Sequence, residues 1–337
     1  MNRDLLAVTL GDPYSVTIEC LGTLFAQGES LRVGAGIPKL IVGASWQWKW
    51  QMERLGLSLP SMKVISSLEV VPREPGFYFF DIDPVGDFSR DPSQLGETSR
   101  GELAKRALRA VTSVDNVQNL AVLTAPIQKS AMEKVQFGFP GQTEYFADQW
   151  GGESLMILGG PRLTVGLVTN HIPIAQVSER LSVDLIIRKI ELFCRYFKET
   201  RKVPHPRIAV TGLNPHCSDH GLFGSEEAEL IEPAISRSRQ VIGSEASVEG
   251  PLPADTVFFR ALNQEFDGVL AMYHDQGLGP LKTVHFFDAI NITSGLKHLR
   301  VSPDHGPASD LFLRRRANYR SFELAYNLCV EYLRSCR

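Results

Sequence analysis

The sequence predicts an α/β protein in two lobes, each built on a mostly parallel sheet. Short apolar runs alternate with stretches of helical spacing along most of the chain. Strands that are apolar on both faces are typical of parallel sheets covered by helices on each side. This rhythm occurs in the first half of the chain and again in the second, and 337 residues are enough for two such lobes.

In the first half, the predicted strands are short apolar segments that stop at turn residues, as LLAVTL stops at Gly11-Asp12-Pro13. These strands cover residues 5–10, 39–43, 64–65, 76–80 and 120–123. The segments between them have apolar residues at helical spacing. The predicted helices cover residues 17–25, 46–55 and 100–116.

The second half follows the same pattern. Its predicted strands cover residues 163–169, 207–211, 268–272 and 290–293. Its predicted helices cover residues 174–196, 225–236 and 321–333. Ligands of such sheets bind at the carboxyl ends of the strands, so polar residues directly after a strand are the first candidates for a site.

Composition narrows the class of protein. Lys and Arg number 35 and Asp and Glu 38, a net charge of −3, which argues against a dedicated nucleic-acid binder. The sequence has neither an apolar run of transmembrane length nor the features of a signal peptide at its start. The five cysteines are far apart and lack a CxxC pair, which favours reduced thiols in a cytoplasmic protein.

Three histidines directly follow predicted strands: His171, His216 and His274. A single histidine in such a position is more often a structural or solvated residue than a ligand. Together, three imidazoles at strand ends can reach one point, and three neutral imidazoles form a catalytic metal site with an open position. Asp275 could orient an imidazole from behind, and His220 is a competing ligand.

Cationic and amide side chains cluster after the last predicted strands. Lys282, Asn291 and Arg300 could bind a phosphate or carboxylate, whereas the run 314–316 (RRR) is more typical of a solvated face. Residues 34–39 (GAGIPK) lack the third glycine of a dinucleotide-binding loop and precede their strand, so they are not interpreted as one.

Taken together, several segments resemble the 4-hydroxythreonine-4-phosphate dehydrogenase (PdxA) family of pyridoxal phosphate biosynthesis. The matching segments occur in family order over about 300 of the 337 residues, and GPLPADT and MYHDQGL are the most specific. They are LGDP (10–13), TAPIQKSAM (124–132), GQTEYFA (141–147), TNHIPI (169–174), GLNPHCSDHGLFGSEE (212–227), GPLPADT (250–256), AMYHDQGLGPLK (271–282), NITSGL (291–296) and DHGPASDL (304–311).

The resemblance implies a two-lobed α/β/α subunit similar to isocitrate and isopropylmalate dehydrogenases. We expect residues 1–130 and 270–337 to form one lobe and residues 131–269 the other, with the active site in the cleft between the lobes. It also implies a cytoplasmic homodimer whose active site is shared between subunits. The family's metal ligands match His171, His216 and His274, and its substrate-binding positions match Gln142, Thr143, Lys282, Asn291 and Arg300.

The implied reaction is oxidation of 4-phosphohydroxy-L-threonine by NAD or NADP, followed by decarboxylation. A divalent metal, such as zinc, cobalt or magnesium, would bind the substrate hydroxyl and the new carbonyl. Lys282, Asp255 and Asp275 are the candidate catalytic residues, the two aspartates for proton transfer or for orienting a ligand. No cofactor fingerprint in the sequence separates NAD from NADP.

The chain departs from the family pattern in three places. The family's GDPAGIGPE is GDPYSVTIE at 11–19, its GHTE is GQTE at 141–144, and its GGHMG is HGLFG at 220–224. Gln142 cannot carry a proton charge as histidine can. Two alternatives therefore remain: a dehydrogenase of a related threonate or erythronate phosphate, and a metal-binding pseudoenzyme without turnover.

Overall fold

A computed structural model describes residues 4–26, 34–58, 61–88 and 91–337. The chain divides into two compact units. Unit 1 contains residues 1–152 and 296–337, and unit 2 contains residues 153–295. The sequence placed these boundaries near residues 130 and 270, whereas in the structure they fall after Gly152 and after Gly295.

Unit 1 has a sheet whose strand pairs are all parallel. Every residue of β1 and β2 is buried, which explains the apolar runs at 5–8 (LLAV) and 40–42 (LIV) within these strands. The strand order is β3 (Met62–Ile65), β4 (Gly76–Asp81), β2 (Pro38–Gly43), β1 (Asp4–Thr9), β5 (Asn119–Thr124) and β12 (Leu299–Pro303).

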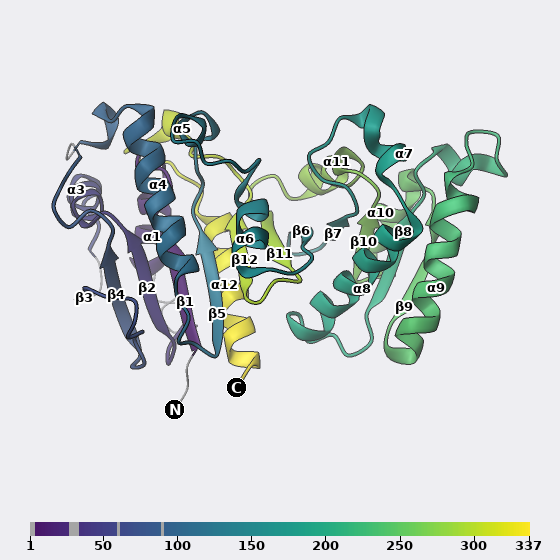
Figure 1. Cartoon of the computed structure of the whole chain (residues 1–337), viewed down its shortest axis with the longest axis horizontal. Helices are drawn as coiled ribbons and strands as arrows, with labels where there is room; N and C mark the ends of the chain where they lie inside the picture. Colours follow the sequence, from purple (N-terminus) through teal and green to yellow (C-terminus); the bar gives the residue numbers. More distant parts are fainter. Residues whose placement is uncertain (1–3, 27–33, 59–60, 89–90) are drawn as a thin grey trace. The chain divides into compact units, whose positions relative to one another are not determined.

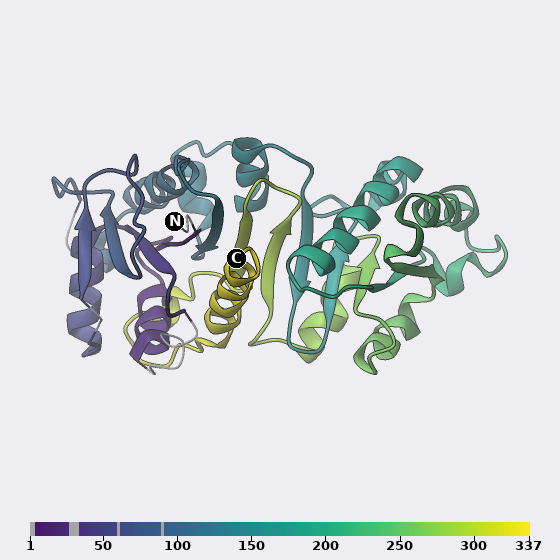
Figure 2. The same cartoon turned by 90° about the horizontal axis from the view of Figure 1, so that it is seen from below.

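Helices cover both faces of the unit 1 sheet (Figures 1 and 2). One face carries α1 (Thr17–Ala26), α3 (Ser45–Leu55) and α12 (Arg320–Ser335), and the other carries α4 (Glu97–Thr112), α5 (Lys129–Lys134) and α6 (Gln142–Trp150). Tyr145 and Phe146 of α6 share a core cluster with Leu5 and Val122 of the sheet. This packing is why residues 131–152 belong to unit 1.

His298 of unit 1 is buried and makes a T-shaped contact with Trp150, with ring centroids 5.2 Å apart. Burial, assisted by the charge of Lys297, lowers the pKa of His298 from 6.5 to about 4. The unfolded chain therefore binds the proton more tightly, and stability is lost as pH falls from about 6.5 towards 4. The expected loss approaches about 3 kcal/mol.

Urea unfolding at neutral pH and near pH 4.5 tests this expectation. The wild type should lose more stability on acidification than His298→Phe, which keeps a ring beside Trp150 but has no titrating group. Equal acid sensitivity of the two proteins would contradict this account.

Unit 2 has a mixed sheet. Its strand order is β11 (Ile290–Ser294), β6 (Leu155–Gly159), β7 (Thr164–Leu167), β10 (Gly268–Ala271), β8 (Arg207–Thr211) and β9 (Ser247–Leu252). The pairs from β7 to β9 are parallel, whereas β6 runs antiparallel to both β7 and β11. The α/β class predicted from the sequence is confirmed, with these antiparallel pairs as the exception.

Two helices lie on each face of the unit 2 sheet (Figure 1). They are α8 (Val183–Glu199) with α9 (Glu232–Ile242), and α10 (Ala254–Leu262) with α11 (His274–Val284). The helix predicted over 174–196 is broken into a short turn (Ile174–Gln176), α7 (Val177–Arg180) and α8. The break occurs where the Ser182 hydroxyl accepts a hydrogen bond from Leu185 N at 3.2 Å and caps α8.

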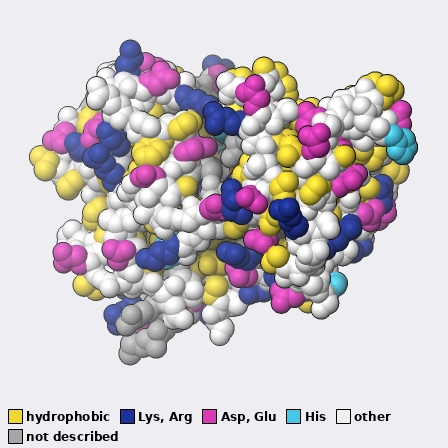
Figure 3. Space-filling model, turned by 45° about the vertical axis from the view of Figure 1, so that its right-hand side comes forward, with side chains coloured by type: hydrophobic (Ala, Val, Ile, Leu, Met, Phe, Trp, Pro, Cys, Tyr) yellow, Lys and Arg dark blue, Asp and Glu magenta, His cyan; other side chains and the backbone are white. Residues whose placement is uncertain are grey.

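The structure also bears on the cysteines, on membrane-spanning helices and on the surface charge. None of the five cysteines forms a disulfide. Among the described residues, no helix is long and apolar enough to cross a membrane. On the face drawn in Figure 3, basic and acidic side chains are interspersed, as expected for a nearly balanced charge.

Candidate functional site

In unit 1, the turns after β1 and β5 meet at the carboxyl edge of the sheet. Gly11 has a φ of 64°, and a Cβ there would lie 2.4 Å from the carbonyl oxygen of Pro126. Asp12 N donates to the same carbonyl at 2.9 Å. Only glycine fits this close approach, so packing requires the Gly11 of the LGDP segment.

Asp12 is buried and fixes the first turn. Its carboxylate accepts two hydrogen bonds from Arg100, at 2.9 and 2.7 Å, and one from Tyr14 N at 2.8 Å. The Arg100 guanidinium also lies over the Tyr14 ring, which packs against Phe312 with centroids 4.6 Å apart. The bulky residue that replaces the family's alanine is thus packed between Arg100 and Phe312.

Gln142, Thr143 and Arg300 are brought together around the end of β5. Gln142 begins α6, and its Nε2 donates to the Ala125 carbonyl at 3.1 Å, while its buried Oε1 has no hydrogen-bond partner among the described residues. Arg300 Nε donates to Thr124 Oγ1 at 2.9 Å, and its Nη1 to Thr143 Oγ1 at 3.4 Å. A helix start beside a guanidinium is a favourable place for an anion.

Arg300 is 3% exposed. Burial lowers the pKa of Arg300 from 12.5 to about 10, against the opposite influence of the Glu144 charge. The side chain therefore stays charged at neutral pH and gives this part of unit 1 a fixed positive charge.

In unit 2, His171 and His274 lie side by side, with ring centroids 5.3 Å apart. His171 follows β7, and His274 begins α11 directly after β10. The Thr169 hydroxyl donates to Met272 O at 2.7 Å and so ties the end of β7 to the end of β10. The two predicted ligands are therefore held next to each other by the sheet.

Asp275 and Gln276 fix the start of α11. His274 Nδ1 lies 2.7 Å from Asp275 Oδ1, an arrangement that orients the ring and leaves Nε2 for another partner. Gln276 accepts from Thr211 Oγ1 and Met272 N, at 2.8 and 2.7 Å, and donates to Gly212 O at 2.7 Å. These bonds join the ends of β8 and β10.

His216 is exposed on the loop after β8, four residues before His220. Among the residues that the structure describes, no group of three or more His, Cys, Asp or Glu side chains is placed to hold a metal ion within one chain. The structure thus pairs His171 with His274 and does not bring the predicted trio to one point.

The remaining predicted residues lie on three elements of unit 2. Asp255 is exposed in the first turn of α10, and Asn291 is half-buried in β11 opposite Leu158 of β6. Lys282 lies near the end of α11, with Nζ 5.8 Å from the centre of the Phe286 ring.

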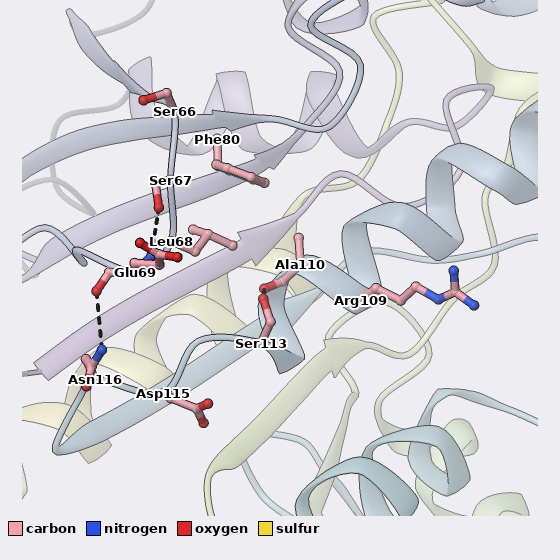
Figure 4. Close-up of a pocket in the computed structure, with 10 residues that line it drawn as sticks. All are labelled: Ser66, Ser67, Leu68, Glu69, Phe80, Arg109, Ala110, Ser113, Asp115 and Asn116. Atoms are coloured by element: carbon pink, nitrogen blue, oxygen red, sulfur yellow. Dashed lines mark hydrogen bonds between the residues drawn. The ribbon is translucent and has the colours of Figure 1, made fainter.

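A separate pocket of about 630 Å³ lies in unit 1 under the segment that joins β3 to β4. It contains none of the predicted site residues. Ser67, Glu69 and Ser113 line it, but the Arg109 guanidinium points away from them (Figure 4). Without converging polar groups, this pocket is not a candidate active site.

Three residues of these surroundings were not predicted from the sequence: Arg100, Phe312 and Glu227, the buried acid beside the His216 loop. Arg100 lies 88 residues from its partner Asp12. No spacing rule connects residues so far apart. Glu227 did stand within the motif GLNPHCSDHGLFGSEE, so its position in that segment was the available signal.

Comparisons with known proteins agree with this description. A sequence model of the family described as "Pyridoxal phosphate biosynthetic protein PdxA" matches residues 55–329. A 4-hydroxythreonine-4-phosphate dehydrogenase of Desulforapulum autotrophicum is 45% identical over 335 residues, covering 98% of this chain and 95% of that protein. A D-threonate 4-phosphate dehydrogenase of Pectobacterium atrosepticum is 31% identical, covering 97% and 98%.

Solved structures show the same relationship. The crystal structure of 4-hydroxythreonine-4-phosphate dehydrogenase from Klebsiella pneumoniae is 31% identical with a TM-score of 0.80, covering 99% of this chain and 98% of that chain. A terephthalate 1,2-cis-dihydrodiol dehydrogenase from Burkholderia xenovorans shares the fold, with a TM-score of 0.64 at 22% identity. The chain belongs to the PdxA family.

Proposed function

We propose that this protein oxidises 4-phosphohydroxy-L-threonine with NAD or NADP and that the product loses CO2, as a step of pyridoxal phosphate biosynthesis. The observation that carries the proposal is the His171–His274 pair, whose rings lie 5.3 Å apart in a chain 45% identical to a 4-hydroxythreonine-4-phosphate dehydrogenase. The carbon that bears the hydroxyl gives a hydride to the nicotinamide, and the oxygen gives up a proton. The carboxylate β to the new ketone then leaves as CO2. The electron pair of the broken C–C bond passes to the ketone oxygen and forms an enolate.

The donor chemistry of unit 2 fits a divalent cation. Two adjacent imidazoles are suitable ligands for zinc or cobalt, and Asp275 orients one of them, as carboxylates do behind metal-bound histidines. We propose His171, His216 and His274 as the residues that hold this cation, which is zinc, cobalt or magnesium. When bound, such an ion supplies a Lewis acid for the substrate oxygen.

The protein's own side chains bind and orient the rest of the substrate. Arg300, Thr143 and the start of α6 form an anion site in unit 1, and Lys282 and Asn291 supply a cation and an amide in unit 2. Both groups serve the phosphate and carboxylate of the substrate. Asp275 positions His274, whereas the exposed Asp255 is the group proposed for proton transfer.

The protein is further proposed to act as a cytoplasmic homodimer in which both subunits contribute to each active site. This assembly is the one implied by the sequence motifs. In such an assembly the histidines that bind one metal ion come from both subunits.

A second candidate function is oxidation of a threonate or erythronate 4-phosphate. The Pectobacterium relative named for D-threonate 4-phosphate favours it, since it matches 97% of this chain. Gln142 is the relevant residue. Its Nε2 is committed to Ala125 O, so it offers the substrate an acceptor oxygen and no proton charge.

The deciding experiment follows the absorbance of the reduced nicotinamide, with metal-loaded protein, each phosphorylated substrate and each cofactor. Turnover with the amino acid substrate supports the first function, and turnover only with threonate or erythronate phosphate supports the second. Binding of metal and substrate without reduction of either cofactor would identify a pseudoenzyme and overturn both.

Metal removal gives a further expected result. Dialysis against a chelator should abolish turnover, because the substrate oxygen loses its Lewis acid. Added Zn²⁺ or Co²⁺ should restore turnover. Full activity of protein shown by elemental analysis to be metal-free would contradict the metal-dependent mechanism.

A further inference from the structure

The loop that carries His216 has an unusual backbone. Five consecutive residues, His216 to His220, have φ values of 52°, 54°, 68°, 43° and 56°, and none of them is glycine. L residues rarely adopt this left-handed conformation even singly, because Cβ crowds the neighbouring carbonyl. A run of five persists only where surrounding contacts over-determine it.

The contacts that hold this left-handed turn converge on Glu227, which is 2% exposed. Its Oε1 accepts from Leu213 N at 2.8 Å and from Asn214 N at 2.7 Å. Its Oε2 accepts from Asn214 Nδ2 at 2.9 Å and from the Ser218 hydroxyl. The Glu227 carboxylate therefore holds the loop by hydrogen bonds on both sides of His216.

Two other features favour a purpose-built arrangement. Glu227 begins a π-helical turn, Glu227–Ile231, ahead of α9, and such turns occur frequently at functional sites. Gly212 lies directly against the carboxylate, since a Cβ there would be 3.0 Å from Glu227 Oε1. The backbone is thus shaped on both sides to admit this buried acid.

We propose that Glu227 is a positioning residue that holds the left-handed turn and thereby fixes His216 for binding the metal. This inference rests on the proposed role of His216 as a ligand. Glu227 acts through the loop and touches neither metal nor substrate. A carboxylate is needed because all four partners are donors, and an amide would face two of them with its own N–H groups.

Glu227→Gln tests the proposal, with Glu226→Gln as the matched control. Glu226 is the adjacent acid and also accepts from Asn214 Nδ2, at 2.8 Å, but its other bond goes to Ser178 and not to the loop backbone. Both variants remove one negative charge near His216. Only Glu227→Gln alters the bonds to the backbone N–H groups of Leu213 and Asn214 and to the Ser218 hydroxyl.

The readout is the affinity of the full-length protein for Co²⁺, measured by competition with a chromophoric chelator, and the visible spectrum of the bound Co²⁺. We expect Glu227→Gln to weaken binding about 10- to 100-fold and to change the spectrum. Glu226→Gln should alter the affinity by no more than about twofold. Melting temperatures establish that each variant is folded.

A double-mutant cycle separates positioning from a general structural role. If Glu227 acts through His216, Glu227→Gln should cause little further loss in a His216→Ala background. An equal loss in both backgrounds, or unchanged affinity in Glu227→Gln alone, would overturn the proposal. Should Glu227→Gln fail to fold, Ser218→Ala removes one donor and keeps the carboxylate. It should weaken Co²⁺ binding about threefold, and unchanged affinity would again overturn the proposal.

The same data distinguish this inference from the proposed function. If His216→Ala binds Co²⁺ as the wild type does, His216 is not a ligand, and both the metal set and the positioning role fall. If His216→Ala weakens binding but Glu227→Gln does not, only the positioning role falls.

Discussion

Replacing His274 or His171 by alanine is expected to lower kcat/KM about 1,000-fold or more and to remove most of the bound divalent metal. The two rings lie 5.3 Å apart at the ends of adjacent parallel strands, and Thr169 locks those ends together. Because the strand ends are rigid, a lost imidazole cannot be replaced by a neighbouring one. Both substitutions should therefore have the same large effect.

The measurements are metal content by elemental analysis and the rate of nicotinamide reduction. His205→Ala is the matched control, since His205 is an exposed histidine of the same unit that is not one of the proposed metal ligands. His220→Ala tests the competing ligand beside His216 and should retain metal. A His274→Ala protein with wild-type metal content and rate would refute the assignment.

The parts of the fold that the sequence predicts well are those whose burial is complete. Parallel strands between two helical layers must be apolar on both faces, so β1, β2 and β5 appear as short apolar runs without any knowledge of their partners. In α8, Ile186, Ile190, Phe193 and Phe197 recur at helical spacing because one face packs on the sheet.

The elements that were not predicted owe their structure to distant partners. β12 contains the buried Arg300 and Ser302, which look like loop residues until Thr124 and Thr143 supply hydrogen bonds to Arg300. α11 contains Gly277, Gly279 and Pro280, which have low helix propensity. Gly277 is required because a Cβ there would lie 2.7 Å from Val165 of β7.

The candidate site shows the same division. A histidine directly after a strand can be found by reading along the chain, and the structure does place His171 beside His274. What fixes such residues cannot be found in this way. Tertiary packing creates the bidentate pair of Asp12 with Arg100. It also creates the hydrogen bonds of Glu227 to residues 213–218. The metal set and the substrate contacts therefore stay predictions for experiment.

Replacing Arg300 by methionine should raise KM for the phosphorylated substrate and lower kcat/KM about 100-fold or more. Arg300 is 3% exposed, and its guanidinium is held in one orientation by Thr124 and Thr143. A cation fixed in a buried place binds an anion strongly because water competes little and no side-chain freedom is lost on binding. The kcat/KM of Arg300→Lys should fall between those of the wild type and Arg300→Met, since lysine keeps the charge but cannot bond both threonine hydroxyls in the same way.

Stability should move in the opposite direction. Burial lowers the pKa of Arg300 to about 10 from 12.5, so the folded protein holds this proton less tightly than the unfolded chain. The charged side chain therefore costs stability at all pH values below about 10, and the cost is relieved only as pH rises from about 10 towards 12.5. Methionine removes that cost, so Arg300→Met should melt at the same temperature as the wild type or higher.

A higher KM together with an unchanged or higher melting temperature would identify Arg300 as a group kept for binding at the expense of stability. Arg106→Met is the matched control, because Arg106 lies on α4 in the same unit and pairs with the partly exposed Glu102 and the buried Asp83. It should leave KM unchanged and lower the melting temperature, because the Asp83 carboxylate loses a cationic partner. An Arg300→Met protein with a lower melting temperature and an unchanged KM would instead mean that Arg300 supports the fold and does not contact the substrate.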